Sequence, residues 1–465
     1  MNVNAAKEYK DFIEKYLLRL LGIGSNNIQS YSGDFKGAYI VQRDGYIYFS
    51  TNTETVFVLE HNRKLSEDNI SAVKNIIISF FAVAKYRTNK SGTAHRYYSV
   101  TQKVSNYELA IQKGICTWII GKANEDVEEL LGILEKWSVQ TYEGKKVTMG
   151  FVINPSLHSN FDSEYGTFKS FIKDDFFAVF TDCIDSVIEV DEHCEFCRYL
   201  SVTENNKVEN YSLSKHLPIR FANVIQKYVT GNRVGIFLLN NGDIILSKNQ
   251  EIRFVKRNLK WLNMSYESFY NALADFADAN GIEESLIEDI YASTLDVSFS
   301  HGGGIISVVE NVSSLTNEEK DGFPILHQCD YLLNRWEYNE LFEYFKEQNE
   351  RYENSGNKHL TVDEKEIRKR ILKRNALDNF IMQKPFGELD RKLRCELISL
   401  DGACILTAKG DICACGAIIK NDSGSSGGGR GAASKKLSRF GMAIKVSTDG
   451  YIELYLNGSS KYSIK

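Results

Sequence analysis

Leu400-Asp401-Gly402-Ala403 and, further along the chain, Gly427-Gly428-Gly429-Arg430-Gly431-Ala432-Ala433 are the two stretches that decide the expected fold. The first is expected to open a strand, and the second to form a glycine loop leading into a helix over 432–438. Glycine lets backbone amides approach an anion, and a helix N-terminus adds partial positive charge. A carboxylate beside such a loop indicates a site for a metal ion and a triphosphate. Two alternatives stay open, because Asp-Gly pairs also form tight turns and glycine runs also form linkers.

Hydrophobic periodicity predicts the elements around these stretches. Leu389, Leu393 and Leu397 recur at a spacing of four with charges between them, which predicts a helix over 386–400. Strands are expected over 403–407, 412–419, 442–447 and 451–455. The last two strands form a hairpin across Asp449-Gly450. This order is typical of a mixed β-sheet flanked by helices.

Length and composition indicate a globular protein of more than one domain. The chain has 465 residues, of which 43% are hydrophobic and 25% charged, and this length exceeds one ordinary core. A net charge of -5 provides no general field for polyanions, so nucleic acid is not expected as the main partner. The N-terminus lacks the pattern of a signal peptide, and the longest apolar stretch, 76–84, is too short to span a bilayer. A soluble, cytoplasmic protein without membrane association is therefore expected.

Two domains and a connecting region are expected along the chain. Residues 1–150 combine helical periodicity with short hairpin strands, which predicts an α+β domain. Residues 151–214 contain polar stretches such as 203–207 and are expected to connect the domains or to continue the first one. A second domain is expected over 215–465, with its motif core at 386–455. The fold class is thus α+β or α/β, with a separate N-terminal domain.

Two clusters outside the motif core have a functional and a packing interpretation. His193-Cys194-Glu195-Phe196-Cys197 contains a C-x-x-C pair that could begin a zinc site, but no second ligand pair follows at suitable spacing, which favours packed thiols. The basic run Arg368-Lys369-Arg370, with Lys373 and Arg374, could contact phosphates, although a solvated helix face is the favoured interpretation.

The motif core resembles the diadenylate cyclase family, also called the DAC domain family. The family's Asp-Gly-Ala motif is present as Asp401-Gly402-Ala403. Its second motif, a glycine and a small residue before Arg-His-Arg, corresponds to 428–433, where one arginine is present. Ser447 matches a position that contacts the triphosphate, and 300–310 looks like an earlier core strand. The resemblance extends back to about residue 215, and the region before it resembles the sensor regions of divergent cyclases.

The resemblance implies an enzyme that condenses two ATP molecules into cyclic di-AMP or a related cyclic dinucleotide, releasing pyrophosphate. Asp401 would bind Mg²⁺ or Mn²⁺ near the attacking hydroxyl, and Arg430 would hold the triphosphate as the second catalytic residue. Gly402 would leave room for the adenosine. The other nucleotide-binding positions implied are Ala403, Gly428, Gly429, Gly431 and Ser447. Two copies would face each other in a homo-oligomer, and the N-terminal domain would respond to an unidentified ligand.

Other functions remain open because the Arg-His-Arg motif is incomplete. Lys435, Lys436 and Arg439 follow on the next expected helix and could replace the missing cations, although at this spacing they are expected to face solvent. A sensor that binds nucleotide or cyclic dinucleotide without turnover is the first alternative. An assembly module whose glycine run is only a linker is the second.

Overall fold

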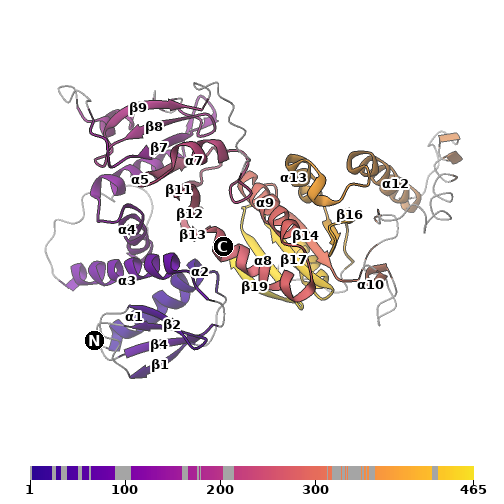
Figure 1. The fold of residues 1–465 in the computed structure, drawn as a ribbon, viewed down its shortest axis with the longest axis horizontal. Helices are drawn as coiled ribbons and strands as arrows, with labels where there is room; N and C mark the ends of the chain where they lie inside the picture. The colour runs from indigo at the N-terminus through magenta and orange to yellow at the C-terminus, as the bar shows by residue number, and fades with distance from the viewer. Residues whose placement is uncertain are drawn as a thin grey trace. The chain divides into compact units, whose positions relative to one another are not determined.

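The computed structural model divides the chain into two compact units, Met1–Phe269 with Ile464–Lys465, and Tyr270–Ser463 (Figure 1). Both combine helices with mixed or antiparallel sheets, which confirms the expected mixture of α and β structure. Among the described residues, no helix has the length and apolar character needed to cross a membrane. The described residues are 3–23, 28–32, 39–50, 55–61, 64–88, 106–159, 166–174, 177, 180–202, 214–311, 313–316, 326, 330, 332, 347, 350–351, 353–354, 362–420 and 428–465.

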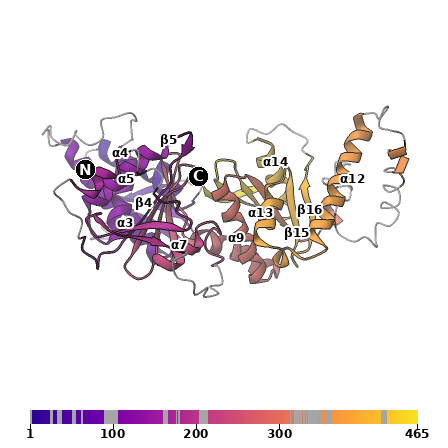
Figure 2. The ribbon, with the colours of Figure 1, turned by 90° about the horizontal axis from the view of Figure 1, so that it is seen from above.

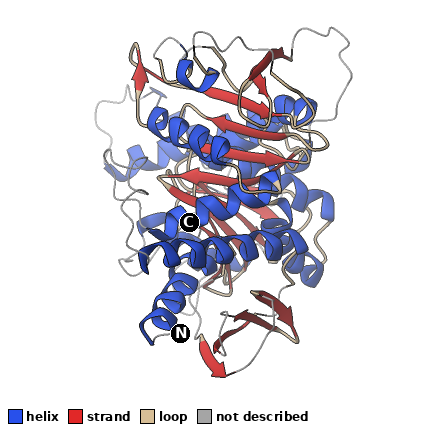
Figure 3. Cartoon of the chain, turned by 90° about the vertical axis from the view of Figure 1, so that its left-hand side faces the viewer, coloured by secondary structure: helices blue, strands red, loops and turns tan. Residues whose placement is uncertain are grey.

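The first unit begins with a helix and a small antiparallel sheet. The helical segment consists of α1 (Val3–Phe12), a π-helical turn (Ile13–Leu17) and α2 (Leu18–Leu20). The sheet, in the order β1-β4-β3-β2, contains β1 (Gln29–Ser32), β2 (Ile40–Arg43), β3 (Tyr46–Ser50) and β4 (Thr55–Glu60). Figure 3 shows these strands as a separate group near the N-terminus. Strands β2 and β3 form a hairpin, as the short hairpin strands expected within 1–150 indicate, with Ile47 of β3 opposite Gln42 of β2.

A seven-stranded sheet forms the centre of the first unit, in the order β13-β12-β11-β10-β7-β8-β9. Its strands are β7 (Met149–Ile153), β8 (Ser186–Val190), β9 (Phe196–Ser201), β10 (Val234–Leu238), β11 (Ile244–Lys248), β12 (Glu251–Arg257) and β13 (Lys260–Asn263). Because β10 pairs with β7, residues on both sides of the expected boundaries at 150/151 and 214/215 belong to one sheet. The compact units instead divide between Phe269 and Tyr270. The polar stretch 203–207 lies outside the described residues.

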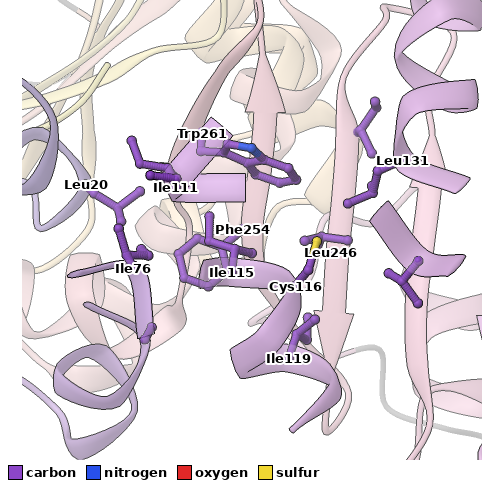
Figure 4. Packing of buried hydrophobic residues seen from close by; sticks show 14 of the residues in the cluster. Leu20, Ile76, Ile111, Ile115, Cys116, Ile119, Leu131, Leu246, Phe254 and Trp261 are labelled. Atoms are coloured by element: carbon purple, nitrogen blue, oxygen red, sulfur yellow. The ribbon is translucent and has the colours of Figure 1, made fainter. Parts of the chain in front are cut away.

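Helices pack against this sheet around one hydrophobic core. They include α3 (Glu67–Thr88), α4 (Asn106–Ile120) and α5 (Glu125–Ser138), and Asn124 caps α5 by accepting from the amide of Val127 at 3.1 Å. Figure 4 shows Ile115 and Cys116 of α4 among buried side chains of the sheet such as Trp261. The remaining short elements of this unit are β5 (Thr141–Tyr142), β6 (Lys145–Lys146), α6 (Phe168–Phe171) and α7 (Ala222–Tyr228).

The second unit contains a six-stranded mixed sheet in the order β16-β15-β14-β17-β18-β19. Its strands are β14 (Gly304–Val309), β15 (Ala403–Thr407), β16 (Ile412–Ala417), β17 (Gly441–Val446), β18 (Ile452–Leu456) and β19 (Ser459–Ile464). Strands β14 and β15 are parallel, and the other neighbours for which a register is known are antiparallel. The four strands predicted after residue 400 are confirmed, whereas β19 was not predicted.

The helices of the second unit differ from the sequence predictions at two places. They are α8 (Tyr266–Asn280), which crosses the division between the units, α9 (Glu284–Ser300), α10 (Ser313–Thr316), α12 (Val362–Ile381), a 3-10 turn (Phe386–Glu388), α13 (Arg391–Ser399) and α14 (Gly428–Leu437). The single helix predicted over 386–400 is wrong, because the 3-10 turn ends at Glu388, Leu389 is extended, and Asp390 caps the separate helix α13 by accepting from the amides of Lys392 and Leu393. The helix predicted to begin at Ala432 already begins at Gly428.

The helix α14 covers one face of the second sheet. Ala433 and Leu437 of α14 share a buried cluster with Ile305, Ile405 and Ala443 of the sheet. The alternate positions along β14, β15 and β17 are also buried, so both faces of these central strands are covered. Figure 2 shows α14 together with β15, β16 and α13.

Candidate functional site

Strand register brings three separate segments to one end of the second sheet. Ile305 of β14 is opposite Ala403 of β15 in a parallel pair, so the segments before these strands, 302–304 and 401–402, lie at the same end. Gly304 is opposite Val446 of the antiparallel β17, so the turn that follows β17 reaches this end as well. We call this end of the sheet, with residues 302–304, 401–403 and 447–448, the motif edge.

The Asp401-Gly402 turn is built by close packing of two glycines. Gly402 has φ +118°, and a methyl group added to it would lie 2.3 Å from the carbonyl carbon of Gly416. Gly416 also has a positive φ, +60°. Gly402 was expected to leave room for adenosine, but contact with the protein's own backbone already requires glycine there. Asp401, just before it, is exposed, so its carboxylate is open to solvent at the motif edge.

Arg430 reaches the motif edge from the first turn of α14. A methyl group added to Gly303 would lie 2.7 Å from Nη1 of Arg430 and 3.0 Å from the amide nitrogen of Thr448. The guanidinium group therefore lies over Gly303, beside the turn between β17 and β18. Gly303 also has φ +63°, so both its conformation and this contact favour glycine. Gly303 and Thr448 were not identified from the sequence as site residues.

The glycines of the second motif form a helix N-terminus rather than a loop. Gly428 and Gly429 are exposed, and added methyl groups there would contact nothing within 4 Å. Gly431 follows Arg430 in the same turn and is buried. The first four N–H groups of a helix have no partner within the helix. This turn therefore directs partial positive charge outward beside Arg430. Gly427 lies outside the described residues.

Two other predicted site residues have structural roles in the sheet. Ala403 is fully buried in the cluster under α14, so its side chain contributes packing rather than a surface for ligand. Ser447 accepts a hydrogen bond at its hydroxyl from the amide of Tyr451 at 3.1 Å, and its own amide donates to the carbonyl of Tyr451 at 2.9 Å. Ser447 thus closes the turn after β17, and its half-buried hydroxyl still has a proton to donate.

The basic cluster of α12 is attached to the Asp401 turn. Arg370 and Lys373 contact the buried carboxylate of Asp330 at 2.7 Å and 3.1 Å. Lys373 also donates to the carbonyl of Gly416 at 2.7 Å, and Gly416 is the residue that packs against Gly402. The expectation of a solvated helix face is therefore wrong for these two side chains. No signal in the sequence links Asp330 to this cluster, because the two are joined only in the folded unit.

Replacing Lys373 with alanine is expected to destabilise the second unit by about 1–3 kcal/mol. The buried carboxylate of Asp330 would lose one of its two cationic partners, and the Gly416 carbonyl would lose its donor. Urea unfolding followed by circular dichroism measures the change. Lys369→Ala removes an exposed lysine from the same helix and is the matched control, expected within about 0.5 kcal/mol of wild type. Equal stability of the two variants would contradict a stabilising role for the contacts of Lys373 with Asp330 and Gly416.

Buried thiols lie behind the motif edge. Sγ of Cys404 and Sγ of Cys415 are 3.6 Å apart, and both residues are buried. The hydrogen bond with Cys415, together with burial, raises the pKa of Cys404 well above its usual value. Cys404 therefore stays protonated at neutral pH and is not suited to act as a nucleophile. Its position indicates packing between β15 and β16.

A preformed multi-ligand metal centre is not found within the described part of the chain. No group of three or more His, Cys, Asp or Glu side chains there could hold a metal ion. In the C-x-x-C segment, Cys194 is buried and Cys197 is half-buried, while Nδ1 of His193 lies 3.1 Å from a carboxylate oxygen of Asp126. The packing interpretation is therefore favoured for these cysteines. A lone exposed carboxylate such as Asp401 suits Mg²⁺, which is commonly held by one or two carboxylates plus substrate phosphates and water.

No protein-family model matches this chain, and no curated protein matches its sequence. A function therefore has to be inferred from the chemistry of the motif edge. That chemistry combines an exposed carboxylate, a guanidinium group over a glycine, and the outward amides of a helix N-terminus.

Proposed function

We propose that the Tyr270–Ser463 unit is a nucleotide cyclase that resembles the diadenylate cyclases and joins two ATP molecules into cyclic di-AMP. This proposal rests on one observation. Asp401 and Arg430, which belong to motifs separated along the chain, lie at the same end of the sheet. One side chain attracts cations and the other attracts phosphates. A nucleoside triphosphate complexed with a divalent cation presents both partners at once.

Each residue of the motif edge has a distinct part in the proposed reaction. Asp401 would hold Mg²⁺ or Mn²⁺, which supplies charge neutralisation for the triphosphate when it is bound. Arg430 and the amides of Gly428 and Gly429 would bind the triphosphate and the departing pyrophosphate. Ser447 would donate its hydroxyl proton to a phosphate oxygen. Gly402 would keep the Asp401 turn in place through its packing against Gly416.

The proposed reaction requires two nucleotides that face each other. The 3′-hydroxyl oxygen of each ATP forms a bond to the α-phosphorus of the other. The bond from that phosphorus to the β-phosphate bridge breaks, pyrophosphate leaves, and the hydroxyl proton passes to solvent. Two such steps give one cyclic dinucleotide and two pyrophosphates. A homo-oligomer with opposed second units would supply this arrangement, and the first unit would regulate it through an unidentified ligand.

Product analysis with all four nucleoside triphosphates tests the proposed function. The full chain is incubated with each nucleotide and either Mg²⁺ or Mn²⁺, and cyclic dinucleotides are identified by mass spectrometry alongside pyrophosphate release. We expect cyclic di-AMP from ATP, with two pyrophosphates for each product molecule. Release of neither pyrophosphate nor any cyclic dinucleotide from the four substrates would reject the cyclase.

A nucleotide sensor is the second candidate, and the incomplete arginine motif favours it. The first turn of α14 carries one arginine, and the remaining motif positions there are glycine or alanine. Binding of ATP or cyclic di-AMP by calorimetry, without pyrophosphate release, would support the sensor. Detection of pyrophosphate would exclude it.

A further inference from the structure

Lys445 is a charged residue on an otherwise buried strand. It lies on β17, where every other residue is buried, and its side chain is only 19% exposed. The register places it between Ile305 of β14 and Glu453 of β18. Its Nζ lies 2.9 Å from Oε2 of Glu453. Because a charge withdrawn from water costs free energy even when it is paired, this position calls for an explanation.

Glu453 is held from two sides. The hydroxyl of Tyr455 donates to the same Oε2 atom at 2.9 Å. Burial, followed by the bond to Glu453, raises the pKa of Tyr455, so its hydroxyl remains protonated and keeps donating. An ammonium group has three N–H donors, and Glu453 uses one of them. Within the described part of the chain, no other hydrogen-bond partner of Lys445 is found. Two donors of Lys445 therefore remain for another acceptor.

The Lys445 ammonium lies at the first turn of α14. A methyl group added to Gly431 would lie 3.9 Å from Nζ of Lys445. Arg430, the neighbouring residue in that turn, extends over Gly303 at the motif edge. The N-terminus of the helix adds partial positive charge. Two cations thus lie at one helix N-terminus, which is a suitable environment for a polyphosphate.

We propose that Lys445 is a second phosphate-binding residue, which acts with Arg430 on the triphosphate of the nucleotide. Glu453 and Tyr455 are positioning residues that hold the ammonium in place. This inference rests on the proposed function, since it requires a nucleoside triphosphate at the motif edge. It also supplies a second cation from a strand, where the glycine-rich motif has only Arg430. The competing explanation is an ion pair that only joins β17 to β18.

Binding measurements on the full chain distinguish these explanations. The variants are Lys445→Met, Lys445→Arg and Glu453→Gln, and the ligands are ATP, inorganic tripolyphosphate and adenosine, measured by calorimetry. We expect Lys445→Met to weaken ATP and tripolyphosphate binding by about tenfold or more and to leave adenosine binding unchanged. Lys445→Arg is expected to retain most of the affinity. Lys461→Met removes an exposed lysine from β19 and is the matched control.

A double variant separates binding from stability. If the pair is only structural, Lys445→Met combined with Glu453→Gln should recover the stability lost in Lys445→Met, and ATP affinity should follow stability. If Lys445 binds phosphate, the double variant should recover stability but not ATP affinity. Circular dichroism during urea unfolding reports whether each variant is folded.

The outcomes for Lys445 and for the cyclase can be told apart. Unchanged binding of ATP and tripolyphosphate by Lys445→Met would overturn the role of Lys445, while cyclic product from wild type would still support the cyclase. Binding of tripolyphosphate that depends on Lys445, without any cyclic product, would support Lys445 and reject the cyclase. A wild-type chain that binds neither ATP nor tripolyphosphate would overturn both.

Discussion

Replacing Gly402 with alanine should destabilise the second unit by about 3 kcal/mol or more. The added methyl group would lie 2.3 Å from the carbonyl carbon of Gly416, 2.6 Å from its carbonyl oxygen and 2.6 Å from the amide nitrogen of Ala417. These are backbone atoms of β16, which cannot rotate away as the end of a side chain can. The φ of +118° adds strain for any residue with a Cβ atom. Urea unfolding of the full chain measures the loss.

Gly429→Ala is the matched control for this substitution. It also places a methyl group on a glycine of the second unit, but nothing lies within 4 Å of that position. Gly429 is in the first turn of α14, where alanine is a better helix former than glycine. Its stability should be unchanged or about 0.5–1 kcal/mol higher. If Gly402→Ala is as stable as Gly429→Ala, the result would contradict the close packing of Gly402 against the backbone of Gly416.

Asp401→Asn should reduce formation of cyclic dinucleotide by about a hundredfold or more under the proposed function. The amide keeps the size of the side chain but lacks the negative charge that attracts a divalent cation. Because Asp401 is exposed, the substitution should leave the stability of the unit within about 0.5 kcal/mol of wild type. Initial rates of cyclic dinucleotide production, measured at saturating Mg²⁺ or Mn²⁺, provide the test.

Glu396→Gln controls for the loss of one negative charge from the same unit. Glu396 is exposed on α13, the helix that precedes the Asp401 turn, and it has no role at the motif edge. Its product formation should equal that of wild type. Undiminished production by Asp401→Asn, with a wild-type unfolding curve, would remove Asp401 from the proposed mechanism.

Local sequence signals predicted much of the second unit. The strands after Ala403 follow from short apolar runs between turn residues, and the hairpin across Asp449-Gly450 follows from its turn sequence. The start of α14 was misplaced because glycine has low intrinsic helix propensity, yet tertiary packing includes Gly428 in the helix. The α13 boundary was misplaced because Leu389, the first leucine of the repeat, lies between the 3-10 turn and α13 and belongs to neither.

Pairing between distant segments could not be predicted from local patterns. Nothing along the chain indicates that β7 lies beside β10, so the expected domain boundaries cut through one sheet. The contact of Arg430 with Gly303 and the attachment of Lys373 to Gly416 likewise depend on which strands are neighbours. Lys445 did carry a signal, because a lone charge within the apolar run Met442–Val446 is unusual for a central strand. A charge at such a position predicts a polar or charged partner on a neighbouring strand, which here is Glu453.

The parallel pairing of β14 with β15 affects how the second unit folds while the chain is being synthesised. Residue 305 pairs with residue 403, about a hundred positions later, so this contact closes slowly compared with a hairpin. On the ribosome, β14 emerges well before either of its neighbours, β15 and β17, has been synthesised. The backbone N–H and C=O groups of β14 lack their strand partners during that interval, so we expect the newly made chain to be most prone to aggregation before β15 is synthesised.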